Sequence, residues 1–193
     1  MNSTDQKPQT KAEWRQLVRL KTQRLPASYF ADSDSRIRAH LLSLPEWKAT
    51  DTLFIYISVG TEPDTRALIK AAWQAGKRVA VPRCMNGGNL EARLITSFDG
   101  LTQSHFNLLE PDEAFPLVPP EALHLVIAPC VAMDRSHHRL GHGGGFYDRY
   151  LAKVQCPVVC LCRHAFLFEA LPADRLDVAV ATTITEQGVF VAK

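Results

Sequence analysis

Four glycines stand within five consecutive positions, Gly141-His142-Gly143-Gly144-Gly145, and this run constrains the fold of the chain more than any other feature. The apolar segment Leu123–Met133 precedes it and indicates a buried strand. After the run, apolar side chains recur at the spacing of an amphipathic helix: Phe146, Tyr147, Tyr150, Leu151 and Val154. The glycines are therefore expected to form a turn between a strand and a helix.

A glycine turn in this position is suited to bind a phosphate group, although such a run alone is also compatible with a flexible loop. Glycine has no Cβ, so a ligand can approach the backbone closely. N–H groups near a helix N-terminus attract anions. Arg139 and Arg149 add positive charge, and Asp148 adds a candidate metal ligand. The run has neither the lysine of the Gly-x-x-x-x-Gly-Lys loop nor the spacing of Gly-x-Gly-x-x-Gly.

The residues around the run extend it to a more specific pattern. Asp134, a short loop, Arg139-Leu140, the glycines and Phe146-Tyr147-Asp148 follow one another. This pattern resembles the signature of the 5-formyltetrahydrofolate cyclo-ligase family, which reads aspartate, loop, Arg-Leu-Gly-x-Gly-x-Gly, two aromatics and aspartate. Asn107-Leu108-Leu109-Glu110-Pro111 is similar to the family's Gly-Ile-Leu-Glu-Pro segment. The resemblance implies an ATP-dependent ligase that cyclises 5-formyltetrahydrofolate to 5,10-methenyltetrahydrofolate, with release of ADP and phosphate.

The resemblance also implies roles for individual residues. Arg139, Tyr147 and Asp148 would be catalytic. Mg²⁺ would be held by Asp148 and Asp177. Folate would be bound by Ile57, Glu62, Phe146 and Tyr147. ATP, as co-substrate, would be bound by Lys11, Arg15, Arg139, Leu140, Gly141, His142, Gly143, Gly144, Gly145, Phe146 and Tyr147.

Several of these residues also have a structural interpretation. Glu62 follows a different strand from the glycine turn, and its carboxylate could support the N-terminus of the next helix. Phe146 and Tyr147 could pack in the helix core or against the pterin. Asp148 could be a helix N-terminal charge, and Asp177 a loop residue. Leu176 stands where the family carries a histidine, and the glutamine that the family carries near Phe166 is missing. A catalytically degenerate nucleotide- or phosphosugar-binding paralogue is therefore the alternative function.

The first part of the chain carries clear helix signals. Thr10-Lys11-Ala12-Glu13 is a capping box that predicts a helix start. Lys11, Arg15 and Arg19 share one face of this helix. That face is either solvated or, as the resemblance implies, directed at ATP phosphates. A second helix is expected from Asp34 to Leu44, ended by Pro45.

The remaining patterns predict an α/β fold. Leu53–Val59 reads as a strand, followed by a helix that ends at Gly76 and a strand over Arg78–Pro82. This βαβ unit favours a parallel sheet. Further strands are expected at 157–162 and 178–184. With the family resemblance, the fold class is a Rossmann-like three-layer α/β/α sandwich with a mostly parallel sheet. Residues 1–9 are expected to be a disordered lead, and residues 10–193 a single domain.

Composition limits the classes of partner. A formal net charge of +2 over 193 residues gives no reason to expect nucleic acid binding. No apolar run is long enough for a membrane span, and the polar N-terminus lacks the apolar core of a signal peptide. Five cysteines without a Cys-x-x-Cys motif fit reduced thiols. These features predict a cytoplasmic protein, which we expect to be a monomer or weak homo-oligomer. The resemblance implies that its partners are a reduced folate and ATP.

Overall fold

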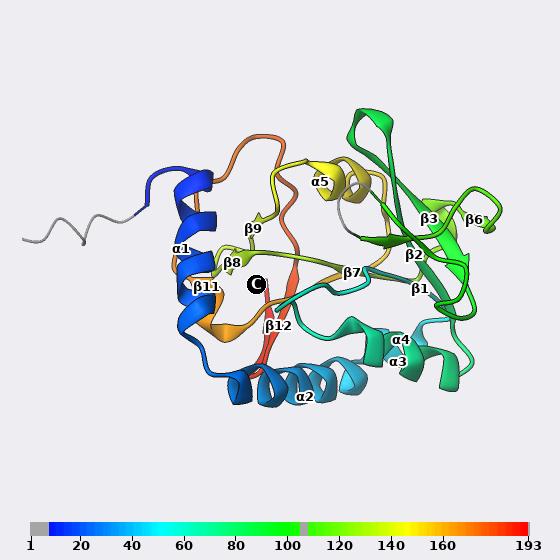
Figure 1. The fold of residues 1–193 in the computed structure, drawn as a ribbon, viewed down its shortest axis with the longest axis horizontal. Coiled ribbons are helices and arrows are strands. Elements are labelled where there is room, and N and C mark those ends of the chain that lie inside the picture. Colours follow the sequence, from blue (N-terminus) through cyan, green and yellow to red (C-terminus); the bar gives the residue numbers. More distant parts are fainter. Residues whose placement is uncertain (1–7, 105–107, 193) are drawn as a thin grey trace, which may run out of the picture.

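Within the described residues, 8–104 and 108–192, the computed structural model has an eight-stranded sheet through its centre and helices on both sides (Figure 1). The helices are α1 (Lys11–Arg24), α2 (Ala27–Ser43), α3 (Pro45–Ala49), α4 (Thr65–Gln74) and α5 (Phe146–Leu151). In spatial order the sheet contains β13 (Gly188–Val191), β12 (Thr182–Thr185), β10 (Val158–Leu161), β7 (Leu125–Ala128), β1 (Thr52–Ile55), β2 (Arg78–Met85), β3 (Asn89–Ile95) and β6 (Leu117–Val118).

Smaller elements lie beside this sheet. One short sheet contains β11 (Leu167–Phe168), β8 (Ala132–Asp134) and β9 (Arg139–Leu140). Another pairs β4 (Thr102–Gln103) with β5 (Leu109–Glu110). Turns of 3₁₀-helix cover Asn86–Gly88, Pro120–Ala122 and His164–Phe166. No helix of the described residues has the length and apolar character that a membrane crossing requires.

The central strands of the main sheet are parallel. β1 pairs in parallel with β2 and β7, and β10 pairs in parallel with β7 and β12. The antiparallel pairings lie toward the two edges, between β12 and β13 and along β2, β3 and β6. The prediction of an α/β fold with a mostly parallel sheet is confirmed.

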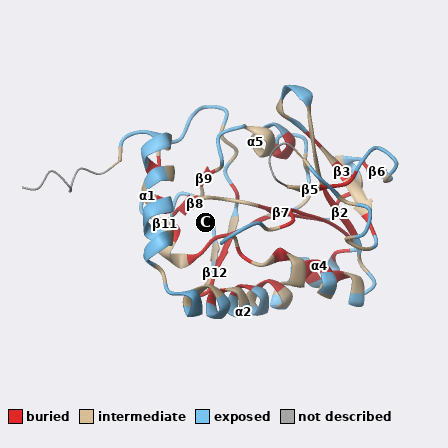
Figure 2. Ribbon diagram, viewed as in Figure 1, coloured by how far each residue is buried: buried red, intermediate tan, exposed pale blue. Residues whose placement is uncertain are grey.

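Side chains of β1 alternate between two cores, one on each face of the sheet. Leu53 and Ile55 belong to the core that contains buried residues of α2, α3 and α4. Phe54 belongs to the other core, with Trp14 of α1 and Tyr150 of α5, and its ring contacts that of Tyr150. All four residues of β1 are buried, as expected for a strand that is covered on both faces. Figure 2 shows the buried strands in the interior and the exposed outer surfaces of α1 and α2. The molecule therefore has three layers.

The local signals at the start of α1 are confirmed. The Glu13 N–H donates to Thr10 Oγ1 at 3.2 Å, and Glu13 Oε2 accepts from the Thr10 N–H at 3.0 Å. Both halves of the capping box are thus formed, and the helix begins at Lys11. Of the expected lead over residues 1–9, residues 1–7 lie outside the described residues.

Other boundaries differ from the sequence-based expectation. The second helix begins at Ala27 rather than near Asp34, and Pro45 opens α3, because proline is well tolerated at the first position of a helix. The apolar segment Leu123–Met133 forms two strands in different sheets, β7 and β8. The predicted strand over 178–184 begins at Thr182 and continues into a hairpin with β13.

Candidate active site

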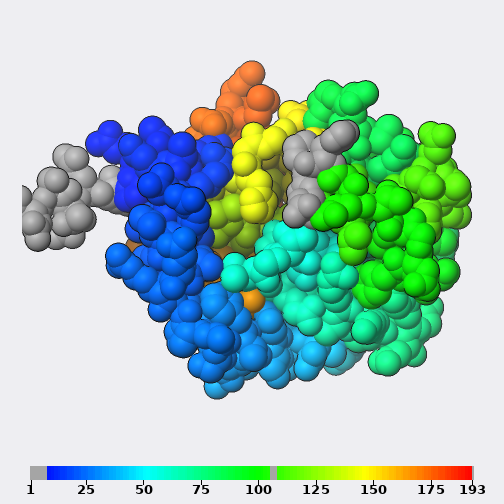
Figure 3. Space-filling model, in the orientation of Figure 1, coloured from blue at the N-terminus to red at the C-terminus, as the bar shows by residue number. Residues whose placement is uncertain are grey.

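A cavity of about 920 Å³ opens beyond the carboxyl end of β1. It lies between α1, the glycine turn and the hairpin of β2 and β3. In Figure 3 the yellow surface around the glycine turn lies between the blue surface of α1 and the green surface of the segment that contains β2 and β3. The predicted site residues that line the cavity are Lys11, Arg15, Ile57, Glu62, Arg139, Gly141, His142, Gly143, Gly144, Gly145, Phe146, Tyr147, Asp148 and Asp177.

Leu140 is the exception among the predicted site residues, because it does not line the cavity. It is 2% exposed and belongs to the core beneath the glycine turn. Its backbone pairs with Ala132 in the antiparallel contact of β8 and β9. Leu140 therefore supports the turn from below.

The glycine turn adopts a backbone that other residues accommodate poorly. Gly143 has φ 106° and Gly145 has φ 65°, in the region that favours glycine. A Cβ on Gly144 would lie 2.7 Å from the ring of Phe146. Gly145 precedes the first residue of α5, which confirms the predicted succession of turn and helix.

Arginines hold the glycine turn from three sides. Arg15 Nε of α1 donates to the Gly141 carbonyl at 2.7 Å. Arg149 donates to the Gly144 carbonyl at 2.5 Å and to the Gly88 carbonyl of the β2–β3 hairpin at 2.8 Å. Arg139 is buried below the turn and donates to Asp148 Oδ1 at 2.8 Å. The turn is thus tied to α1, to the hairpin and to α5.

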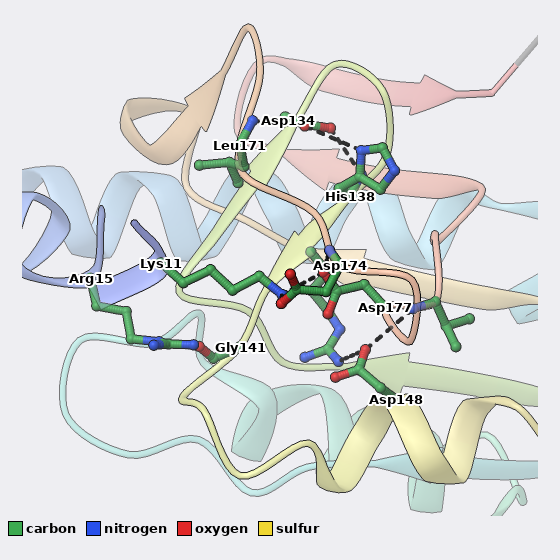
Figure 4. A network of polar contacts seen from close by, with 11 residues as sticks. Lys11, Arg15, Asp134, His138, Gly141, Asp148, Leu171, Asp174 and Asp177 are labelled. Carbon is green, nitrogen blue, oxygen red and sulfur yellow. Dashed lines mark hydrogen bonds and ion pairs between the residues drawn. The ribbon is translucent and has the colours of Figure 1, made fainter. Parts of the chain in front are cut away.

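Lys11 and Asp177 contact each other directly (Figure 4). Lys11 Nζ lies 2.5 Å from Asp177 Oδ2 and 2.7 Å from Asp174 Oδ2. Burial works against charge on both groups, but the hydrogen bonds to Asp174 and Asp177 raise the pKa of Lys11. Burial would raise the pKa of Asp177, but the hydrogen bonds from the Asp174 N–H and the Lys11 ammonium have the larger effect and lower it. Both groups are therefore charged near neutral pH.

Asp148 and Asp177, the predicted metal ligands, line the same cavity but have separate cationic partners, Arg139 and Lys11. Asp148 Oδ1 also accepts from the Val178 N–H at 3.4 Å, next to Asp177 in sequence. In the described part of the chain, no three His, Cys, Asp or Glu side chains are grouped as a metal site. The shared metal site stays a prediction.

Glu62 lies against the glycine turn, although it follows a different strand. Its Oε1 is 3.3 Å from His142 Nε2, and its Oε2 accepts from the Val59 N–H at 2.9 Å. Asp64, rather than Glu62, caps α4 by accepting from the N–H groups of Arg66 and Ala67. The cavity therefore brings the predicted folate and phosphate residues into one space.

Sequence reasoning missed other residues of the cavity wall: Tyr56, Cys84, Glu110 and Asp174. The Tyr56 and Tyr147 hydroxyls and Glu110 Oε1 are buried, with no hydrogen-bond partner among the described residues. Burial raises the pKa of both tyrosines well above the ordinary value, with the Glu62 charge adding to the shift. They are neutral hydroxyl donors. Two sequence signals lay close to these residues: Tyr56 directly precedes Ile57, and Glu110 belongs to the segment that resembles the family's Gly-Ile-Leu-Glu-Pro. Neither signal could show that a polar atom of the side chain is buried without a hydrogen-bond partner.

The geometry of the wall separates the cavity into two ends. Charged side chains, Lys11, Arg15, Arg139, Asp148, Asp174 and Asp177, accompany the glycine turn at one end. Apolar side chains come from the β2–β3 hairpin and from the segment that contains β5: Pro82, Leu90, Leu108 and Leu109. Arg149 also lines the cavity and joins the glycine turn to this hairpin. Such a cavity is suited to a ligand pair with a polyanionic part and a flat, largely apolar part.

Comparison with known proteins identifies the same family as the sequence signature. The model of the 5-formyltetrahydrofolate cyclo-ligase family matches residues 6–186. The 5-formyltetrahydrofolate cyclo-ligase of Escherichia coli K12 is 28% identical over 180 residues, which cover 90% of this chain and 99% of that protein. The Mycolicibacterium smegmatis cyclo-ligase is 34% identical over 150 residues, covering 73% of this chain and 76% of that protein.

A solved structure shares the fold. The NMR structure of Aquifex aeolicus 5,10-methenyltetrahydrofolate synthetase matches with a TM-score of 0.82 at 29% sequence identity. The match covers 94% of this chain and 92% of that chain. The signature, the fold and the extent of these matches show that the chain belongs to the 5-formyltetrahydrofolate cyclo-ligase family.

Proposed function

We propose that this protein catalyses the ATP- and Mg²⁺-dependent cyclisation of 5-formyltetrahydrofolate to 5,10-methenyltetrahydrofolate, with release of ADP and phosphate. One observation carries the proposal. The family's glycine turn, Lys11 and Arg15 of α1, and Ile57 and Glu62 line a single cavity. Both substrates could therefore meet there, with the transferred phosphate next to the formyl group.

The chemistry couples one phosphoryl transfer to one ring closure. The formyl oxygen attacks the γ-phosphorus of ATP and ADP leaves, which turns a poor leaving group into a phosphate ester. N10 of the folate then attacks the formyl carbon and loses its proton. The carbon–oxygen bond breaks and phosphate departs. Such a sequence needs the protein mainly to position the reactants and neutralise charge.

The residues at the charged end would bind the nucleotide. Lys11 and Arg15 would reach the phosphates from α1, and the glycine turn would contact them through its backbone. The guanidinium of Arg139 has one buried nitrogen, Nε, without a partner in the described residues. Arg139 would stabilise charge on the transferred phosphate, and Leu140 would support the turn from the core.

Asp148 and Asp177 would hold Mg²⁺, since carboxylate and phosphate oxygens are its preferred ligands. Their position on the wall of one cavity supports this assignment. Both carboxylates are paired with cations in the free protein, so the ion would enter with the nucleotide, whose phosphates would take over Lys11 and Arg139. Once bound, Mg²⁺ would neutralise phosphate charge during the transfer.

The folate would occupy the apolar end. Phe146 and Tyr147 would pack against the pterin, with Ile57 and Glu62 completing the wall. Tyr147 also stacks on Phe54 at a centroid distance of 6.2 Å, so it serves the core as well. We further propose that residues 10–193 act as one domain, as a monomer or weak homo-oligomer in the cytoplasm. The free thiols of all five cysteines fit such a reducing compartment.

The test is to incubate the protein with 5-formyltetrahydrofolate, ATP and Mg²⁺ and to follow the absorbance of the methenyl product. Product is expected only when both ATP and Mg²⁺ are present, with one ADP formed for each methenyl group. Product without nucleotide would refute the proposal. A folded protein that binds ATP and makes no product would instead support the catalytically degenerate paralogue.

A further inference from the structure

Glu110 is a buried carboxylate on the wall of the cavity and has an unpaired oxygen. The residue is 7% exposed and lies at the end of β5. Its Oε2 accepts from the Cys84 N–H of β2 at 3.2 Å. Its Oε1 is buried without a hydrogen-bond partner in residues 8–104 and 108–192. Asn107, which begins the family-like segment, lies outside the described residues.

The surroundings of Glu110 do not balance its charge. No lysine, arginine or histidine of the described residues forms an ion pair with it, although several cationic side chains also line the cavity. Burial, reinforced by Glu110, raises the pKa of the Cys84 thiol to about 12, so this neighbour is a neutral and weak donor. A buried carboxylate oxygen without a strong hydrogen-bond donor is unfavourable, and a ligand that supplies such a donor would relieve this cost.

The location of Glu110 indicates which kind of ligand would supply the hydrogen-bond donor. Pro82, Leu90 and Leu109 line the same end of the cavity, and Phe146 provides an aromatic face. A flat heterocycle with an N–H edge fits apolar walls that end in a carboxylate. Two adjacent N–H groups suit a carboxylate best, because its two oxygens accept a parallel pair of hydrogen bonds.

We propose that Glu110 binds the amidine edge of the pterin ring, formed by N3–H and the 2-amino group. This inference rests on the proposed function and extends it to the orientation of the folate. Oε1 would accept one N–H, and Oε2, which keeps a free lone pair beside the Cys84 bond, would accept the other. The pterin would then lie at the apolar end, with its formyl group directed toward the glycine turn. Glu110 would also select against heterocycles that lack the amino group.

A role limited to the fold is the competing explanation, because Glu110 links β5 to β2 through Cys84. Glu110→Gln separates the two roles. The amide oxygen of glutamine can still accept from the Cys84 N–H, so the link is retained. The amide nitrogen replaces a carboxylate oxygen and faces the pterin donors with a further donor. Glu113→Gln is the matched control, since the Glu113 side chain is 86% exposed and outside the cavity wall.

The experiment measures binding by calorimetry without turnover, using 5-formyltetrahydrofolate, its analogue without the 2-amino group, and ATP. The wild-type protein is expected to bind the analogue roughly ten-fold more weakly than the natural folate, as expected for the loss of a charge-assisted hydrogen bond. Glu110→Gln should lose a similar factor for the natural folate, lose little for the analogue, and keep its ATP affinity. Glu113→Gln should match the wild type for all three ligands.

Each other outcome has a defined meaning. Equal binding of the folate and its analogue by the wild type would overturn the assignment without any variant. Unchanged folate affinity in Glu110→Gln, or equal losses for folate and ATP, would also overturn it and leave the proposed function intact. A wild-type protein that binds ATP and no folate would refute both proposals.

Discussion

Lys11 and Asp177 neutralise each other in the free protein, at the position where a nucleotide and its metal ion are proposed to bind. The pKa shifts of the two groups favour their charged forms, so both are ionised near neutral pH. Ligand binding would therefore exchange ionic partners without moving a proton. The phosphates would take the ammonium, and Mg²⁺ would take the carboxylate.

Arg15 provides a test of the basic face of α1. Arg15→Ala should weaken ATP binding by roughly ten-fold or more, because charge-assisted hydrogen bonds contribute about 1.5–3 kcal/mol. Folate binding should change much less. The matched control is Arg19→Ala, one turn further along the same face, where the side chain is exposed and outside the cavity wall. Calorimetry that gives equal ATP affinities for both variants would show that Arg15 does not bind the nucleotide.

Asp148 and Asp177 are predicted to act on one metal ion. Asp148→Asn, Asp177→Asn and the double variant should be impaired to a similar extent, because loss of either ligand disables the same ion. Excess Mg²⁺ should partly restore each rate. Asp174→Asn is the control, since Asp174 pairs with Lys11 but its side chain is 76% exposed. Rates that multiply in the double variant, with an unchanged Mg²⁺ requirement, would show two independent roles.

Individual site residues were predictable from sequence to different extents. The signature identified the glycine turn and its neighbours, since their order along the chain is local information. Glu110 and Tyr56 were not predicted, because an unpaired oxygen depends on which groups the folded chain brings near it. The contact between His142 and Glu62 joins residues 80 positions apart and had no sequence signal.

At the scale of elements, Glu186 connects α2 to the strands at the far side of the sheet. It accepts from Tyr29 Oη at 2.5 Å, Ser33 Oγ at 3.1 Å and the His164 N–H at 2.9 Å. Burial alone would raise the pKa of Glu186, but these hydrogen bonds hold it below the ordinary value of 4.5. The ionised carboxylate is therefore part of the folded structure.

Glu186→Gln is predicted to lower the free energy of unfolding by about 1.5–3 kcal/mol near neutral pH, the range for hydrogen bonds to a charged group. Since the folded pKa is the lower one, this contribution is present above pH 4.5 and disappears as pH falls through the folded pKa. Urea unfolding at pH 7 and at a series of pH values that decreases from 4.5 measures this loss. Glu169→Gln, which removes an exposed partner of Arg135, should have little effect at any of these pH values. A pH-independent difference would contradict the prediction.

The elements that sequence predicted best were those with local signals. The capping box set the start of α1, and the turn residues around Gly76 set the end of α4. The division of Leu123–Met133 was not predictable from hydropathy, because both halves are fully buried. The chain leaves the main sheet at Pro129 and enters a second one, and this change depends on the partners of each strand.

At the scale of the whole molecule, the parallel sheet places chain segments from distant parts of the sequence around one cavity. The carboxyl end of β1 contributes Tyr56 and Ile57, α1 contributes the basic face, and the glycine turn faces both. This is the edge where ligands of open α/β sheets bind. The phosphates are proposed to bind at one end of the cavity and the pterin at the other, so the formyl oxygen would lie between them.

The most direct test of this arrangement follows the formyl oxygen itself. The protein would be incubated with ATP, Mg²⁺ and 5-formyltetrahydrofolate that carries ¹⁸O in the formyl group, and the released phosphate would be analysed by mass spectrometry. We expect one ¹⁸O atom in the phosphate for each methenyl group formed, because the formyl oxygen would leave bonded to the phosphorus that it attacked. Methenyl product accompanied by unlabelled phosphate would contradict the proposed transfer of phosphate to the formyl oxygen.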